Sequence, residues 1–211
     1  MKIFSFCCGP FQTNTYLIAC EQTNNGAVVD PALGSKELCM ETLEKAKIRC
    51  QAIFLTHSHF DHIAEVSPLK KEYGAAVYIH PFDAPNLENP GSDLLPLPFP
   101  IEGVMPDYFL EDGMRIMLGN MELLVIHTPG HTPGGVCFYA QKEKILFSGD
   151  TLFQGSIGNI SFPTAQPQKM WDSLKKLSRL PSETKVYPGH GPPTTMKKEN
   201  WLEKAEEIFS G

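Results

Sequence analysis

The chain has 211 residues, of which 42% are hydrophobic, so it is long enough to bury a sizeable core and is near the usual upper size of one compact domain. We therefore predict a single domain over residues 1–211. The net charge is −6 at pH 7, from 18 basic and 24 acidic residues. Because no basic run or stripe could neutralise a phosphate backbone, we do not expect nucleic acid as a partner.

The short apolar stretch at residues 3–8 is below the usual length of a signal-peptide core. No apolar run approaches the length of a membrane span, so we expect a soluble, cytoplasmic protein without a membrane partner. The six cysteines are scattered and form no C-x-x-C pair. None belongs to a local cluster of histidine and aspartate, which favours buried, reduced thiols over metal ligands or nucleophiles.

The first half of the chain begins with β structure. Residues 16–20 and 27–29 are short apolar runs on either side of Asn25-Gly26, and Asn-Gly is the strongest short signal for a hairpin. Residues 35–48 place apolar and charged side chains at roughly helical spacing. Ser35 can cap this predicted helix.

Two further strands and a helix are predicted before a long irregular segment. Residues 52–55 form a short apolar run typical of a strand buried on both faces, and residues 76–79 predict another strand. Between them, Ser67-Pro68 is typical of an N-cap and the first helical position, with Gly74 ending the helix. Repeated prolines and glycines over residues 81–106 predict a long surface loop, of the kind that often borders active sites.

The second half of the chain repeats the sequence of strands followed by helices. Strands are predicted at residues 115–118, 122–126, 136–139 and 145–147, and helices at about 166–180 and 197–209. Strands dominate each half and no repeat of 20 to 50 residues is visible. This order of elements favours an α/β or α+β sandwich.

Residues 57–62 place three imidazoles and a carboxylate within six positions: His57, His59, Asp61 and His62. Such a density is costly if the groups are buried without partners, which indicates a metal site. In an extended segment, side chains two positions apart share a side. His57 and His59 can therefore converge on one ion, while Asp61 and His62 point toward another.

Three more residues that can bind metal lie in glycine-containing turns after strand-like runs. They are His131 in Gly-His-Thr-Pro-Gly, Asp150 in Gly-Asp-Thr and His190 in Gly-His-Gly. Each alone is a weak signal, because such residues commonly bond their own backbone in turns. With residues 57–62 they supply seven nitrogen or oxygen donors. His80 and His127 are interpreted instead as surface or hydrogen-bonded core histidines.

The motifs H-x-H-x-D-H, G-H-T-P-G, G-D-T-L-F and P-G-H-G, in this order, resemble the metallo-β-lactamase superfamily, and most closely its small glyoxalase-II-like branch. The resemblance extends to the opening G-P-F-Q-T-N-T-Y and to Val29-Asp30-Pro31, so it covers nearly the whole chain. It implies a four-layer αββα sandwich, with two sheets face to face, helices outside and a metal site at one rim.

The resemblance also implies a role for each predicted ligand. His57, His59 and His131 would bind a first ion; Asp61, His62 and His190 a second; and Asp150 would bridge both. Two ions can share a water whose pKa they lower, so that a hydroxide attacks the substrate carbonyl. Asp61 would orient this hydroxide as a catalytic residue. Zinc is the expected metal, with iron or manganese as alternatives for an all-N/O ligand set.

The expected activity is hydrolysis of a thioester such as S-lactoylglutathione, because a thiolate leaving group needs little protonation. One alternative is cleavage of other esters or lactones. Another is a persulfide dioxygenase with a single iron held by His57, His59 and His131 or Asp150. A binding protein on an inherited fold is the least favoured, because it has no reason to keep seven costly ligand positions. Asn159 stands where this branch usually has a basic residue near a glutathione carboxylate, and it cannot supply that charge.

Overall fold

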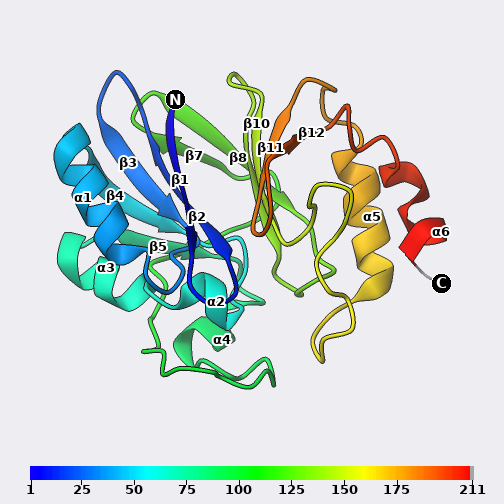
Figure 1. The fold of residues 1–211 in the computed structure, drawn as a ribbon, viewed down its shortest axis with the longest axis horizontal. Helices are drawn as coiled ribbons and strands as arrows, with labels where there is room; N and C mark the ends of the chain where they lie inside the picture. Colours follow the sequence, from blue (N-terminus) through cyan, green and yellow to red (C-terminus); the bar gives the residue numbers. More distant parts are fainter. Residues whose placement is uncertain (210–211) are drawn as a thin grey trace.

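Two sheets pack face to face between two layers of helices in the computed structural model, which describes residues 1–209 (Figure 1). The first sheet has the order β1-β2-β3-β4-β5-β6 and the second β12-β11-β10-β9-β8-β7. Helices α1 and α3 lie outside the first sheet, and α5 and α6 lie outside the second. The predicted four-layer αββα sandwich is therefore confirmed.

The strands of the first sheet are β1 (Lys2–Cys8), β2 (Thr13–Ala19), β3 (Asn25–Val29), β4 (Arg49–Phe54), β5 (Ala76–Ile79) and β6 (Tyr108–Phe109). Those of the second are β7 (Arg115–Leu118), β8 (Met121–His127), β9 (Val136–Ala140), β10 (Ile145–Gly149), β11 (Lys185–Pro188) and β12 (Thr194–Thr195). The helices are α1 (Lys36–Ala46), α2 (Phe60–Ile63), α3 (Val66–Tyr73), α4 (Ala84–Glu88), α5 (Pro167–Leu177) and α6 (Ala205–Phe209), with a 3-10 turn at Leu202–Lys204.

Three hydrophobic layers fill the spaces between the four layers of secondary structure. In β2, Leu17 packs in the layer under α1 and α3, whereas its neighbours Tyr16 and Ile18 pack between the sheets. In β10, Leu146 packs against the α5 side of the second sheet, whereas Phe147 packs between the two sheets. Both faces of each sheet are thus buried, which explains why these strands are continuous apolar runs.

Several predicted elements are confirmed, but two helix starts differ from the prediction. The β2–β3 hairpin and α1 form as expected, yet Ser35 makes no side-chain cap bond. The carboxylate of Glu65 instead accepts the backbone N–H groups of Gly34 and Lys36. Helix α3 begins one residue before Ser67, whose hydroxyl donates to Glu102. A distant carboxylate thus takes the place of the local cap in α1, whereas in α3 the Ser67 hydroxyl is bonded to a distant side chain instead of to the helix backbone.

The predicted continuous helix at 197–209 is wrong. Glu199 is buried, and its carboxylate accepts hydrogen bonds from Gly155 N, the Thr194 hydroxyl and Trp201 Nε1. These bonds, one of them to a residue 44 positions away, hold the chain in a turn, so only the 3-10 turn and α6 follow. The expected loop at 81–106 also contains the short helix α4. Strands β1, β6, β11 and β12 were not predicted, because they are short or lie at sheet edges.

Five of the six cysteines are buried and all are free thiols. Four of the buried ones pack in the hydrophobic layers; Cys39, for example, lies on the face of α1 that packs against the first sheet. Within residues 1–209, none belongs to a cluster of groups that could hold a metal ion. The prediction of buried, reduced cysteines is confirmed for all but the exposed Cys7. No helix in this part of the chain has the length and apolar character needed to cross a membrane.

Candidate metal centre

The predicted ligands lie where strands end at one rim of the sandwich. Strands β3 and β4 are parallel, as are β10 and β11, so the carboxyl ends of each pair meet at one edge of their sheet. Strand β8 is antiparallel to β9, which is antiparallel to β10, so β8 also ends at this edge. The loops that follow these strands therefore converge, although the motifs are far apart in the sequence.

The first group consists of His57, His59 and His131, which each offer one ligand atom within 4.8 Å of the others. The ring centroids of His59 and His131 are 4.4 Å apart, and those of His57 and His59 are 4.8 Å apart. All three residues are buried. This convergence of three imidazoles suits a transition-metal ion.

Asp61, His62 and His190 form the second group, whose ligand atoms also lie within 4.8 Å of one another. His190 Nε2 is 3.3 Å from both Asp61 Oδ2 and His62 Nε2. Asp61 and His62 belong to the short helix α2, whereas His190 follows β11. A third set of ligand atoms within this distance, from Asp30, His57 and His62, links the two groups, so the division between two ions stays a prediction.

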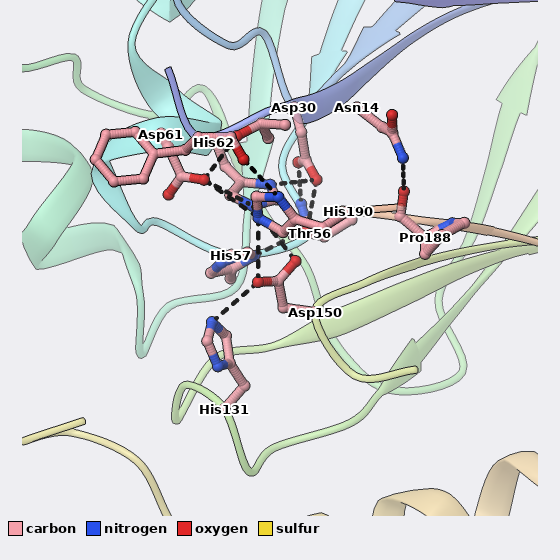
Figure 2. Close-up of polar contacts among 12 residues, drawn as sticks. Asn14, Asp30, Thr56, His57, Asp61, His62, His131, Asp150, Pro188 and His190 are labelled. Carbon is pink, nitrogen blue, oxygen red and sulfur yellow. Dashed lines mark hydrogen bonds and ion pairs between the residues drawn. The ribbon is translucent and has the colours of Figure 1, made fainter. Parts of the chain in front are cut away.

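Asp150 lies between the two groups, as Figure 2 shows. Its Oδ2 is 3.4 Å from Nε2 of His131 and 3.5 Å from Nε2 of His190. Its Oδ1 is 3.4 Å from Nε2 of His62. A single carboxylate therefore contacts both groups, which is the position required of a bridging ligand.

Hydrogen bonds to Nδ1 fix the orientation of four of the imidazoles. His62 Nδ1 is 3.0 Å from Asp30 Oδ2, and His131 Nδ1 is 2.7 Å from the carbonyl oxygen of Asn159. His57 Nδ1 is 3.0 Å from the Thr56 hydroxyl, and His190 Nδ1 is 3.1 Å from the carbonyl oxygen of Phe11. Acceptors at Nδ1 select the tautomer that leaves the Nε2 lone pair free. Such bonds are typical of histidines that bind metal.

Four buried atoms of the predicted ligands have no hydrogen-bond partner: Nε2 of His57, His59 and His131, and Oδ1 of Asp150. Leaving a buried polar atom unpaired costs about 1–3 kcal/mol, more for a charged one. A divalent cation would satisfy all four at once. These residues therefore fit a metal ion.

The protonation states of the two groups also suit a cation. Burial and neighbouring imidazoles lower the pKa of His57 and His59, to about 3 for His59, so both rings are neutral ligands. Burial opposes ionisation of Asp150, but the adjacent imidazoles lower its pKa to about 2. Burial likewise opposes charge on His62, yet Asp61 and Asp150 raise its pKa. The space between the carboxylates of Asp61 and Asp150 therefore favours a positive charge, such as that of a metal ion.

Two glycines of the motifs are required by close contacts around Asp150. A Cβ atom at Gly189 would collide with Asp150 Oδ1 and with the ring of His62. Gly149 has a φ of +48°, and a Cβ atom there would collide with the Thr56 side chain. The glycines therefore allow the backbones of β4, β10 and β11 to approach closely enough for the ligands to meet.

The family model described as the metallo-beta-lactamase superfamily matches residues 8–190, which include all seven predicted ligands. The chain belongs to the metallo-β-lactamase superfamily. Seven convergent donors in two groups fit the one or two metal ions that this superfamily binds. The assignment of each ligand to an ion remains a prediction.

Three proteins illustrate the similarity to other metallo-β-lactamase proteins. Hydroxyacylglutathione hydrolase GloC of Haemophilus influenzae is 31% identical over 193 residues, covering 90% of each chain. The B3 metallo-beta-lactamase BLEG-1 is 36% identical with a TM-score of 0.86, covering 94% of this chain and 96% of that one. TTHA1623, solved in a di-iron-bound form, is 40% identical with a TM-score of 0.81, covering 93% and 96%.

Sequence reasoning did not identify the residues that support the ligands of this metallo-β-lactamase site. Asp30 was recognised only as part of a motif, but its carboxylate accepts bonds from Thr56 N and the Thr56 hydroxyl and contacts His62. The Thr13 hydroxyl donates to Asp61 Oδ2 at 2.7 Å. Both residues lie in motifs that resemble the family, but the motifs alone gave no indication that they support the ligands.

Three residues whose roles were open at the sequence level now have defined contacts. His80 and His127 stack with their ring centroids 4.1 Å apart, outside the two ligand groups, as the sequence interpretation expected. The Asn159 carbonyl accepts a bond from His131 Nδ1, and its side-chain oxygen accepts the N–H of Ser161. Asn159 is therefore a turn residue that also orients a predicted ligand.

Asp83 joins the two loops that carry the first group of histidines. This buried carboxylate accepts the N–H of Ser58 at 3.1 Å and that of Gly134 at 2.6 Å. We expect Asp83→Ala to lower the free energy of unfolding by roughly 2–4 kcal/mol, because two buried N–H groups lose their acceptor. Urea titration measures this loss, with the exposed Asp172→Ala as control. Equal stabilities of the two variants would contradict the linking role.

Proposed function

We propose that the chain is a metal-dependent hydrolase that cleaves a thioester. The observation that carries this proposal is the pair of ligand groups on either side of the Asp150 carboxylate. The proposed ligands are His57, His59 and His131 for one ion, Asp61, His62 and His190 for the other, and Asp150 for both. Two bound ions would polarise a carbonyl group and lower the pKa of a water molecule between them.

The donor set limits the identity of the metal. All seven proposed ligands offer nitrogen or oxygen atoms, which suits zinc, iron or manganese. We propose zinc, since imidazole-rich sites with carboxylates are common for this ion. The similarity to TTHA1623 in its di-iron-bound form supports iron as the alternative.

Asp61 is the residue that we propose to orient the attacking water. It lines the cavity above the two groups, and Thr13 and His190 hold its Oδ2. A carboxylate held in this way accepts a hydrogen bond from the water and fixes the direction of attack. The carbonyl carbon gains the oxygen of water and loses sulfur, and the products are a carboxylate, a thiolate and two protons, one of which reprotonates the thiolate.

The residues around the cavity support a thioester rather than a substrate with a poor leaving group. Every titratable residue that lines it belongs to the proposed ligand set: His59, Asp61, His131, Asp150 and His190. No separate acid among the described residues of this wall would protonate a departing nitrogen or alkoxide. A thiolate departs without such an acid. The name of the Haemophilus influenzae relative also supports a thioester of glutathione as substrate.

Metal analysis and a thioester assay together test this function. Protein purified without chelators is expected to hold close to two metal ions per chain and to hydrolyse S-lactoylglutathione. Removal of the metal should abolish the activity, and zinc should restore it, because the ligands supply no nucleophile of their own. Equal hydrolysis with and without metal, or a chain that binds no metal, would contradict the proposal.

The similarity to BLEG-1 favours a second candidate function, cleavage of a β-lactam. The same metal centre would serve both reactions, but an amide nitrogen requires protonation as it leaves. Nitrocefin should therefore be assayed in parallel, and faster cleavage of nitrocefin than of every thioester would favour the lactamase.

A single bound iron with oxygen uptake on glutathione persulfide would instead identify the dioxygenase.

A further inference from the structure

A cavity of about 270 Å³ lies above the two ligand groups, and its walls are mostly aromatic. Phe11 comes from the turn between β1 and β2, Phe60 from the start of α2, and Phe153 and Phe162 from the loop between β10 and α5. Leu95, from the segment after α4, completes the apolar wall. Separate parts of the chain thus contribute large apolar side chains to one cavity.

The aromatic rings lie against the proposed metal ligands. The edge of Phe162 contacts both His59 and His131, with ring centroids 5.4 and 5.7 Å apart. Phe153 is 5.8 Å from His190 by the same measure. If the carbonyl of a substrate lies at the proposed ligands, the groups attached to that carbonyl therefore lie between Phe153 and Phe162.

Further aromatic contacts fix the outer part of the wall. Phe11 and Phe60 meet edge to face with centroids 4.9 Å apart, and Phe60 contacts Phe99 at 5.9 Å. Phe11 is nevertheless 43% exposed. Large apolar side chains that converge on a cavity while remaining partly exposed are typical of a surface that a ligand covers.

The described residues that line this cavity include no lysine and no arginine. Glutathione carries two carboxylates, and protein sites usually hold such groups with basic side chains. Asn159 lines the cavity but cannot replace a basic residue, and its side-chain oxygen is already bonded to Ser161 N. Apart from the proposed ligands, the walls therefore offer apolar contacts and no lysine or arginine for the two carboxylates of glutathione.

Building on the hydrolase function above, we propose that the cavity selects uncharged thioesters with an aromatic or branched apolar acyl group. The cavity of about 270 Å³ has room for an acyl group and the adjacent sulfur beside the proposed ligands. Phe153 and Phe162 are the specificity-determining residues in this proposal. They contact the acyl group, while the ligand groups below act on its carbonyl.

Four matched thioesters test the proposal: phenylacetyl and lactoyl groups, each on glutathione and on uncharged N-acetylcysteamine. We expect phenylacetyl-N-acetylcysteamine to have the highest kcat/KM, roughly tenfold or more above the lactoyl compound, because apolar contacts discriminate on this scale. Phe162→Ala and Phe153→Ala should reduce this ratio severalfold. Phe109→Ala, an exposed aromatic change on the edge strand β6, is the control and should leave it unchanged.

The outcomes separate this proposal from the hydrolase function. Metal-dependent cleavage that is fastest for S-lactoylglutathione would support the hydrolase and overturn the apolar selectivity. If no thioester is cleaved, calorimetry with the corresponding non-hydrolysable thioethers still decides the selectivity. Tighter binding of the uncharged phenyl compound than of the glutathione compounds, lost in Phe162→Ala, would support it. Equal or reversed affinities would overturn it.

Discussion

Asp150→Asn is expected to abolish nearly all metal-dependent hydrolysis. Its carboxylate contacts His62, His131 and His190 and so meets both ligand groups. Asparagine keeps the size but offers one neutral oxygen, so it cannot bridge two cations. We expect kcat/KM to fall on the order of 10³-fold or more, the scale of losing a principal electrostatic contribution. Metal content should fall from about two ions per chain to one or fewer, as measured by mass spectrometry.

Asp172→Asn provides the matched control, because the same chemical change is made on the exposed face of α5. It should leave metal content and kcat/KM unchanged. Urea titration of metal-free Asp150→Asn should show that it still folds, since the substitution removes a buried charge without changing volume. A folded Asp150→Asn protein that keeps two ions and activity within threefold of the original would show that Asp150 does not bridge.

The seven candidate ligands could be found from sequence because each signal is local. Residues 57–62 concentrate four donors in six positions, and the other three donors each adjoin a glycine after a strand-like run. The structure brings them together at one rim because β4, β8, β10 and β11 end there. The candidate ligands are therefore marked by short motifs, whereas their convergence comes from the pairing of strands that end at the same rim.

The supporting residues could not be found in this way, because their roles depend on contacts distant in sequence. Asp30 reaches Thr56 only after β3 pairs with β4, and Asp83 reaches Ser58 and Gly134 only after the sheets have packed. The same reason explains the errors in the helices. Glu199 interrupts the predicted last helix, and one of its bonds is to Gly155 N, 44 residues away, which no local pattern could identify.

The aromatic cavity, and with it the proposed choice of substrate, could not be predicted from the sequence for the same reason. Phe162 lies in no motif, and Phe11, although part of the opening motif, carries no signal for a role in substrate binding. In the fold they lie in one wall above the ligands. Only Asn159 gave a hint, because it lacks the charge expected for glutathione. The cavity that we propose to select the substrate is therefore built largely from loops whose positions the motifs do not determine.

Asp30→Asn is expected to weaken the second ligand group more than the first. Asp30 Oδ2 contacts His62 Nδ1 at 3.0 Å and accepts the Thr56 hydroxyl at 2.6 Å, while Oδ1 accepts Thr56 N at 2.8 Å. Asparagine tolerates the left-handed backbone at this position, where φ is +49°. Its amide group, however, must face one of these donors. His62 then loses its fixed orientation, and metal affinity at this group should fall about 10–100-fold.

Competition titration with a chelator measures the two affinities separately, and urea titration should show a loss of about 1–3 kcal/mol in the metal-free protein. Thr56→Ser is the control, because it keeps the hydroxyl that joins Asp30 to His57. Its affinities should stay close to the original values. If Asp30→Asn instead lowers stability but leaves both affinities unchanged, Asp30 supports only the backbone at the end of β4. A loss of metal affinity confined to the group that contains His62 would instead show that Asp30 acts by orienting the His62 imidazole.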